Sequence, residues 1–267
     1  MALWGAIIGD IVGSMYEHQV YPVIPDNFPL FGDQDHITDD TVTTVAIAAA
    51  IRKSKGNWHT LSNVASKELR YWCRKYPDLG YGLSFMNWFM VDEAPAYGSW
   101  ANGSAMRVSA AGWVGNSEKE TEEIAALTSR VTHDHPEGIA GAKATAVAIY
   151  LARTGSSKED IKAYIQEKYY PLQATLREIK QTCIPTTRAS LSVPEAIQCF
   201  LESTSYEDAL RNAVTLNCDT DTQSAIAGSI AEAFYGIPEQ IIMASRPYIP
   251  APLHTEIEKF HNTFQIQ

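Results

Sequence analysis

Three glycines stand four residues apart near the start of the chain, at Gly5, Gly9 and Gly13. The surrounding segment, "GAIIGDIVGSMYE", has the apolar periodicity of a helix, and this spacing places the glycines on one stripe of it. Glycine lowers the stability of a helix interior by about 1 kcal/mol relative to alanine, so three of them need a compensating contact. The close approach of a second helix supplies one. The stripe therefore predicts tightly packed helices.

Helical periodicity continues along the rest of the chain, whereas strand-like alternation is scarce. With 45% hydrophobic residues among 267, the chain can bury a substantial core. No linker, low-complexity tract or internal repeat divides it. We expect an all-α fold with one compact domain over residues 1–267. The predicted helices cover residues 2–16, 39–53, 60–75, 104–114, 119–131, 137–153, 158–168, 192–202, 206–216, 222–235 and 253–263.

One predicted helix begins with an acidic cluster. In "HITDDTVTTVAIAAA", Thr38 precedes Asp39 and Asp40, and small apolar residues follow at helical spacing. Thr38 suits the N-cap position, and the helix dipole favours negative charge in the first turn. For a single acidic helix start, a capped helix is a sufficient explanation.

A second predicted helix begins in the same way. In "NCDTDTQSAIAGSIAEAF", Asp219 and Asp221 alternate with threonines before a small apolar helix. If the two clusters converge, four carboxylates repel one another unless a cation neutralises them. Oxygen ligands without histidine or cysteine suit Mg²⁺ or Mn²⁺, and the hydroxyls of Thr38 and Thr222 would complete the coordination. The residues leave two interpretations open: one metal centre, or two unrelated capped helices.

Other polar residues are candidates for the same site. Glu17 follows Asp10 by seven residues on the same helix face, so it either reaches a metal centre or forms a solvated helix end. His133 and His135 diverge on a helix, so one of them contacts a ligand or the segment is a turn. The loop "DEAPAYGSWANGSAMRV", residues 92–108, either presents backbone N–H groups to a phosphate or is an ordinary helix cap.

The overall composition limits the class of partner and the compartment. A formal charge of −10 argues against bulk nucleic-acid binding and against an anionic membrane surface. The apolar N-terminal segment lacks a basic leader, so we expect neither a signal peptide nor a membrane span. The cysteines form no CxxC pair or disulfide-like framework, so we expect reduced thiols in a cytoplasmic protein. We also expect a monomer. The four cysteines are Cys73, Cys183, Cys199 and Cys218.

Six segments between residues 3 and 240 resemble, in content and order, those of the ADP-ribosylglycohydrolase family. That family includes the dinitrogenase-reductase-activating glycohydrolase and the ADP-ribosyl-acceptor hydrolases. The segments are "GAIIGDIVGSMYE", "ITDDTVTTVAIA", "ANGSAMRVSAAG", "THDHPEGIAGA", "SVPEAIQCFLESTSYEDALRNAV" and "CDTDTQSAIAGSIAEAFYG". The resemblance implies an orthogonally packed all-α domain with a dinuclear metal centre in a cleft.

The resemblance also implies roles for single residues. Glu17 matches a mobile glutamate near the metals, and His133 matches a histidine that approaches the ligand. The segment Asn102, Gly103 and Ser104 matches a loop that holds phosphate and ribose. The residues that match metal ligands are Thr38, Asp39, Asp40, Asp219, Asp221 and Thr222. The chain has Ala101 before Asn102, where many members have glycine, which bears on the choice of acceptor.

The activity implied is hydrolysis of the bond between C1 of the distal ribose and its acceptor, with two divalent cations, Mg²⁺ or Mn²⁺. Glu17 is the first candidate for handling the proton and Asp39 the second. The expected substrate is an ADP-ribosylated protein or an ADP-ribose derivative, with the acceptor left open. Two alternatives are a two-metal phosphoester hydrolase, and an ADP-ribose-binding or structural protein of the same fold, since the family has a lens crystallin relative.

Overall fold

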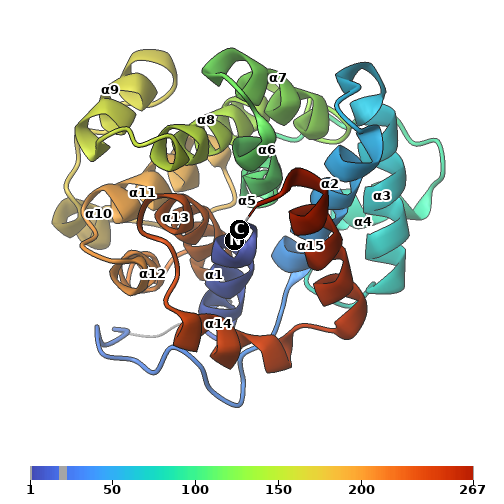
Figure 1. The fold of residues 1–267 in the computed structure, drawn as a ribbon. Helices are drawn as coiled ribbons and strands as arrows, with labels where there is room; N and C mark the ends of the chain where they lie inside the picture. The colour runs from blue at the N-terminus through green and yellow to red at the C-terminus, as the bar shows by residue number, and fades with distance from the viewer. Residues whose placement is uncertain (1, 18–22, 267) are drawn as a thin grey trace.

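The central feature of the computed structural model is the contact between two helices, α1 (Trp4–Ser14) and α13 (Thr220–Tyr235) (Figure 1). A Cβ atom added to Gly9 would lie 2.1 Å from the carbonyl oxygen of Ser224 in α13, and the other two glycines of the stripe have similar contacts. Side chains at these positions would force the helices apart. The predicted close helix contact is therefore confirmed, and its partner is α13.

The structure describes residues 2–17 and 23–266, and within them it contains helices and one isolated β-bridge but no strand. The all-α prediction is confirmed. The remaining α-helices are α2 (Asp39–Ser54), α3 (Leu61–Lys75), α4 (Leu83–Met90), α5 (Gly103–Met106), α6 (Ser109–Val114), α7 (Glu118–Ser129), α8 (Pro136–Arg153), α9 (Lys158–Lys168), α10 (Leu176–Thr182), α11 (Ala189–Leu201), α12 (Tyr206–Val214), α14 (Glu239–Ser245) and α15 (Ala251–Phe264). Two short 3-10 helices are η1 (Trp58–Thr60) and η2 (Arg246–Tyr248).

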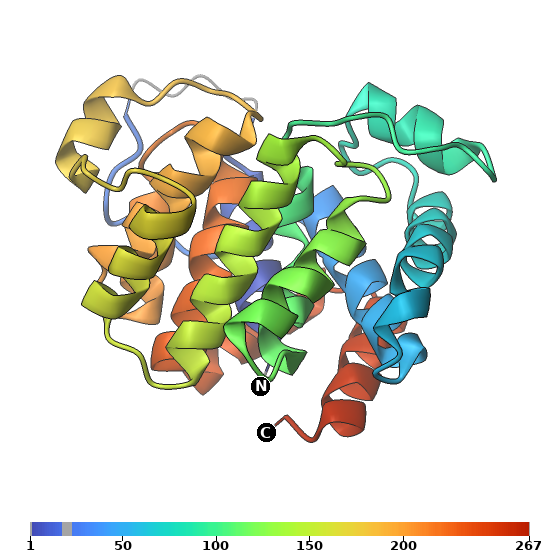
Figure 2. The same ribbon diagram turned by 90° about the horizontal axis from the view of Figure 1, so that it is seen from above.

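The helices form one compact body around α1. Helices α2, α3 and α15 lie on one side of α1, and α11, α12 and α13 lie on the other (Figure 1). Seen from above, α7 and α8 run side by side across the molecule (Figure 2), and α8 also contacts α13. Because α1 contacts both α2 and α13, it joins the two helices whose N-termini carry the acidic clusters.

The helix boundaries differ from the predicted ones in a few places. The predicted helix at 104–114 is two helices, α5 and α6, because the chain leaves helical geometry at Arg107. Helix α11 begins three residues earlier than predicted and contains Pro194 within its length. Helices α4, α10 and α14 were not predicted, since each has only seven or eight residues. No helix within the described residues has the length and apolar character needed to cross a membrane.

Candidate active site

The two acidic segments meet at the N-termini of α2 and α13. The Thr222 hydroxyl lies 3.4 Å from Asp40 Oδ2, and the Thr38 hydroxyl lies 3.5 Å from Asp221 Oδ2. These pairs are separated by 182 and 183 residues along the chain, so tertiary packing creates the cluster. Thr38 also caps α2 as predicted, accepting a hydrogen bond from the Asp40 backbone N–H at 3.2 Å.

A further buried carboxylate, Asp10, connects α1 to this cluster. Its Oδ2 accepts hydrogen bonds from the backbone N–H groups of Thr38 at 2.9 Å and Thr41 at 3.0 Å, and its Oδ1 accepts one from the Thr38 hydroxyl at 2.7 Å. Asp10 thus fixes the start of α2. This role was not predicted from the sequence, although a single acid in an otherwise apolar, glycine-striped helix was a signal for it.

Glu17 approaches the second acidic segment. One carboxylate oxygen each from Glu17, Asp219 and Asp221 lies within 4.8 Å of the others. Glu17 is half-buried and lies in the turn three residues after the end of α1, the helix that packs on α13. The three carboxylates are close enough to share one cation.

Burial of so many acids in one place disfavours their charged forms. Burial, with the charge of Asp221 adding to it, raises the pKa of Asp10 to about 6 and that of Glu17 to about 10. The same two causes raise the pKa of three other carboxyls well above the ordinary value. These are Asp39, Asp40 and Asp219. Without a cation, the cluster therefore holds protons near neutral pH.

The donor atoms suit a hard divalent cation. Asp40 Oδ1 is buried and has no hydrogen-bond partner among the described residues, which is costly unless something binds it. The neighbouring donors are carboxylate and hydroxyl oxygens, the ligands that Mg²⁺ and Mn²⁺ prefer. The acidic cluster can thus hold metal.

The pKa shifts predict how pH affects the metal-free protein. Acids that are protonated when folded and ionised when unfolded contribute stability that is full below the unfolded pKa, about 4, and is lost as pH rises through the folded pKa. For Asp10 and Glu17 those folded values are about 6 and about 10. We expect the melting temperature after chelation to fall by about 5 °C or more between pH ~6 and pH ~9. Differential scanning calorimetry measures this.

Two controls accompany that measurement. Added Mg²⁺ should flatten the dependence, because a cation stabilises the ionised carboxylates, and Glu17→Gln should reduce the slope. A metal-free melting temperature that stays constant or rises over this interval would contradict the protonated cluster.

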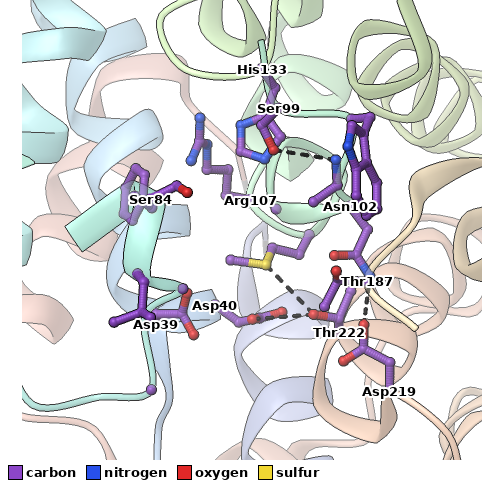
Figure 3. Close-up of a pocket in the computed structure, with 18 of the residues that line it drawn as sticks. Asp39, Asp40, Ser84, Ser99, Asn102, Arg107, His133, Thr187, Asp219 and Thr222 are labelled. Carbon is purple, nitrogen blue, oxygen red and sulfur yellow. Dashed lines mark hydrogen bonds between the residues drawn. The ribbon is translucent and has the colours of Figure 1, made fainter. Parts of the chain in front are cut away.

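A cavity of about 580 Å³ opens over the cluster, within the size range of small-molecule sites. Figure 3 shows its two unlike ends: Asp39, Asp40 and Asp219 lie at one, and Arg107 and His133 at the other. One end is therefore rich in carboxylates, and the other carries a guanidinium and an imidazole.

The loop before α5 and the first turn of α5 border the cavity, and the three candidate residues there differ in orientation. Asn102 Nδ2 donates to Asp219 Oδ2 at 2.6 Å and to the Ser192 hydroxyl at 2.9 Å, so it connects the loop to the acidic cluster. Gly103 lines the cavity, whereas the buried Ser104 hydroxyl donates to the Gly138 carbonyl at 2.8 Å and does not line it. Thr38 also lies behind the cavity wall.

Arg107 is a cavity residue that the sequence analysis missed. It is only 2% exposed, and its guanidinium carbon lies 5.4 Å from the centre of the Phe85 ring. Its Nε has no hydrogen-bond partner among the described residues. A lone arginine between small apolar residues in "GSAMRVSAAG" was the available signal.

The expectation of four reduced cysteines is wrong for two of them. Cys183 and Cys218 form a disulfide, with Cα atoms 6.4 Å apart and a sequence separation of 35, while Cys73 and Cys199 are free and buried. The pairing joins the end of α10 to the residue before Asp219, a proximity that arises only in the fold.

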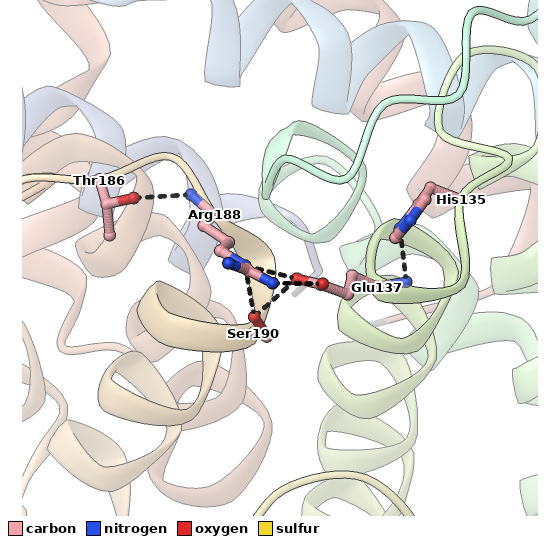
Figure 4. A network of polar contacts seen from close by, with 5 residues as sticks. All are labelled: His135, Glu137, Thr186, Arg188 and Ser190. Carbon is pink, nitrogen blue, oxygen red and sulfur yellow. Dashed lines mark hydrogen bonds and ion pairs between the residues drawn. The ribbon is translucent and has the colours of Figure 1, made fainter.

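The segment after Cys183 forms another wall of the cavity. The Thr187 carbonyl accepts a hydrogen bond from the Asn102 N–H at 2.7 Å, which pairs the segment with the loop before α5. Arg188 then makes two hydrogen bonds to the Glu137 carboxylate, at 2.9 and 2.7 Å, and Ser190 adds a third at 2.6 Å (Figure 4). This network fastens the wall to the start of α8.

The sequence matches the model of the ADP-ribosylglycohydrolase family over residues 1–260. The chain belongs to this family. It is accordingly a glycohydrolase, and the resemblance noted from its motifs is confirmed.

Individual members of the ADP-ribosylglycohydrolase family agree with this assignment. ADP-ribosylhydrolase ARH3 of Bos taurus is 26% identical over 98% of this chain and 92% of its own length. ADP-ribosylarginine hydrolase Tri1 of Pseudomonas putida is 23% identical over 88% of this chain and 70% of its own length. A solved structure described as an ADP-ribosylglycohydrolase-related protein complex has a TM-score of 0.76 at 18% identity, covering 99% of this chain and 95% of that one, which shows the shared fold.

Proposed function

We propose that the protein is a metal-dependent hydrolase that removes ADP-ribose from a modified acceptor, a protein side chain, by cleaving the bond at C1 of the distal ribose. The observation that carries this proposal is the polarity of the cavity. Its carboxylate end suits cations and the hydroxyls of a ribose, and its Arg107 and His133 end suits the oxygens of a diphosphate. Two relatives are named as an ADP-ribosylhydrolase and an ADP-ribosylarginine hydrolase, and these names support the same substrate class.

The residues proposed as metal ligands are oxygen donors around the meeting point of α2 and α13. When bound, two cations, Mg²⁺ or Mn²⁺, would supply positive charge to hold vicinal ribose hydroxyls and to lower the pKa of a water. The proposed ligands are Thr38, Asp39, Asp40, Asp219, Asp221 and Thr222.

The side chains of the protein would perform three further tasks. Positive charge develops on the ribose ring as the acceptor leaves, and the surrounding carboxylates stabilise it. Glu17 accepts a proton from the attacking water or returns one to the acceptor, with Asp39 as the second candidate. Asn102 holds the loop against Asp219 through its 2.6 Å hydrogen bond, so the loop and the acidic cluster keep a fixed spacing.

The product of the reaction tests this proposal. The purified protein is incubated with ADP-ribosylated acceptors, modified separately on arginine, on serine or on a nucleic-acid base, with Mg²⁺, with Mn²⁺ or with chelator. We expect free ADP-ribose with metal only. Release of AMP would indicate phosphoester hydrolysis instead, and binding of ADP-ribose without any product would indicate a binding protein.

A further inference from the structure

A chain of buried hydrogen bonds runs behind the donor end of the cavity. Arg107 Nη2 lies 2.7 Å from the Thr132 hydroxyl oxygen, and that oxygen lies 2.8 Å from Nδ1 of His133. All three side chains are buried, with residue exposures of 2%, 0% and 4%. Of these three residues, His133 and Arg107 line the cavity and Thr132 does not, so Thr132 lies behind the cavity wall.

The direction of these hydrogen bonds follows from the chemistry of the groups. A guanidinium has donors and no acceptor, so the Thr132 oxygen must accept from Arg107. The single hydroxyl proton of Thr132 then has one remaining partner within the described residues, Nδ1 of His133. If Nδ1 carried a proton instead, the Thr132 hydroxyl proton would be buried without an acceptor, which is costly. Nδ1 is therefore the acceptor, and the ring proton of a neutral imidazole sits on Nε2.

The other ring nitrogen of His133 points toward the loop before α5. A Cβ atom added to Gly103 would lie 3.1 Å from Nε2, so a glycine at this position leaves room for the ring. No group within residues 2–17 and 23–266 accepts a hydrogen bond from Nε2. Its N–H is thus available to a ligand in the cavity.

We propose that Thr132 and Arg107 are positioning residues that hold His133 as a neutral Nε2–H donor for an anionic oxygen of the substrate. The identity of that oxygen, a phosphate of ADP-ribose, rests on the function proposed above. Burial and the nearby charge of Arg107 lower the pKa of His133, which agrees with a neutral ring. A neutral imidazole carries one ring proton, so one nitrogen donates and the other accepts. The Thr132 hydroxyl donates to Nδ1 and therefore leaves the ring proton on Nε2.

The tautomer can be observed without any substrate. Long-range ¹H–¹⁵N NMR of histidine-labelled protein, with His133 assigned by its loss in His133→Ala, separates protonated from unprotonated ring nitrogens. In the wild type we expect an unprotonated Nδ1 and a protonated Nε2 for His133. In Thr132→Val the two shifts should approach each other, because both tautomers become populated, and Thr132→Ser should restore the wild-type pattern. A protonated Nδ1 in the wild type, or an unchanged pattern in Thr132→Val, would overturn the proposal.

Binding of ADP-ribose, measured by calorimetry, tests the consequence. We expect Thr132→Val to weaken binding by about tenfold, as for the loss of one oriented hydrogen bond, and Thr132→Ser to stay within about threefold of wild type. In a His133→Ala background the valine substitution should add less than about twofold, because Thr132 acts through His133. An equal loss in both backgrounds would make Thr132 merely structural and would overturn the proposal.

The two readouts separate this proposal from the proposed function. If the wild-type protein does not bind ADP-ribose, the proposed substrate is wrong, while the NMR patterns of the wild type and of Thr132→Val still decide whether Thr132 orients the ring. If Thr132→Val fails to fold, which circular dichroism reports, Thr132→Ala removes the same hydroxyl and is expected to give the same loss of the wild-type pattern, and an unchanged pattern there would overturn the proposal.

Discussion

Replacing Glu17 with glutamine is expected to lower turnover by about 10²- to 10⁴-fold, the usual contribution of a general acid–base group. The structure gives two reasons. First, one carboxylate oxygen of Glu17 lies within 4.8 Å of a carboxylate oxygen of Asp219 and of Asp221, where a reacting sugar would be held. Second, burial and the charge of Asp221 raise the pKa of Glu17 to about 10 in the metal-free protein. Glutamine keeps the size and polarity of the side chain but removes the exchangeable carboxyl proton.

The measurement for Glu17→Gln is single-turnover release of ADP-ribose at saturating metal, beside the affinity for ADP-ribose by calorimetry. Affinity should remain near the wild-type value, since the residues proposed to bind metal and phosphate are unchanged. Glu167→Gln is a matched control, because Glu167 is an exposed residue of α9. Near-normal turnover would return the proton-handling role to Asp39, whereas loss of affinity together with rate would make Glu17 a ligand or a gate.

Asp221→Asn is expected to lower activity at least about 100-fold and to lower the metal content of the purified protein, because even outer partners of metal ligands change affinity by 10- to 100-fold. Asp221 is the central charge of the cluster: its charge raises the pKa of Asp10, Asp39, Asp40 and Glu17. Removing that charge relieves repulsion in the metal-free protein. The melting temperature after chelation should therefore rise, while the increase produced by added metal should shrink.

Elemental analysis and calorimetry with and without metal measure these two opposite changes. Asp33→Asn is a suitable control, because Asp33 is exposed. The wild-type enzyme should lose its activity in excess chelator and regain it with Mg²⁺ or Mn²⁺. Full activity in chelator would rule out the metal-dependent mechanism, and a lower metal-free melting temperature of Asp221→Asn would rule out the account of charge repulsion.

Sequence periodicity predicted the long helices well, because α1, α2, α8 and α13 each repeat small apolar residues over several turns. It missed α4, α10 and α14, whose seven or eight residues are too few to establish a period. The glycine stripe predicted a close helix contact, but a stripe does not identify its partner. That partner, α13, is known only from the fold.

Those residues of the candidate site that belong to a local sequence motif could be predicted, and the other residues could not. The acids of the two helix starts were visible because each follows a recognisable capping pattern. Asp10, Arg107 and the Cys183–Cys218 disulfide were not, because their importance depends on contacts with distant segments. The orientation of the Ser104 side chain could not be predicted either: its hydroxyl donates to the Gly138 carbonyl, because its position on α5 turns it toward α8.

The contact between α1 and α13 also has a consequence for biosynthesis. The first acids of the cluster leave the ribosome long before Asp219 and Asp221, which follow Asp40 by about 180 residues and must close that long loop. Until α13 is made, the glycine stripe of α1 has no partner, and Asp39 and Asp40 do not yet have Asp219 and Asp221 beside them. The proposed metal site is therefore complete only after the N-terminal part of α13 has been synthesised and has packed on α1.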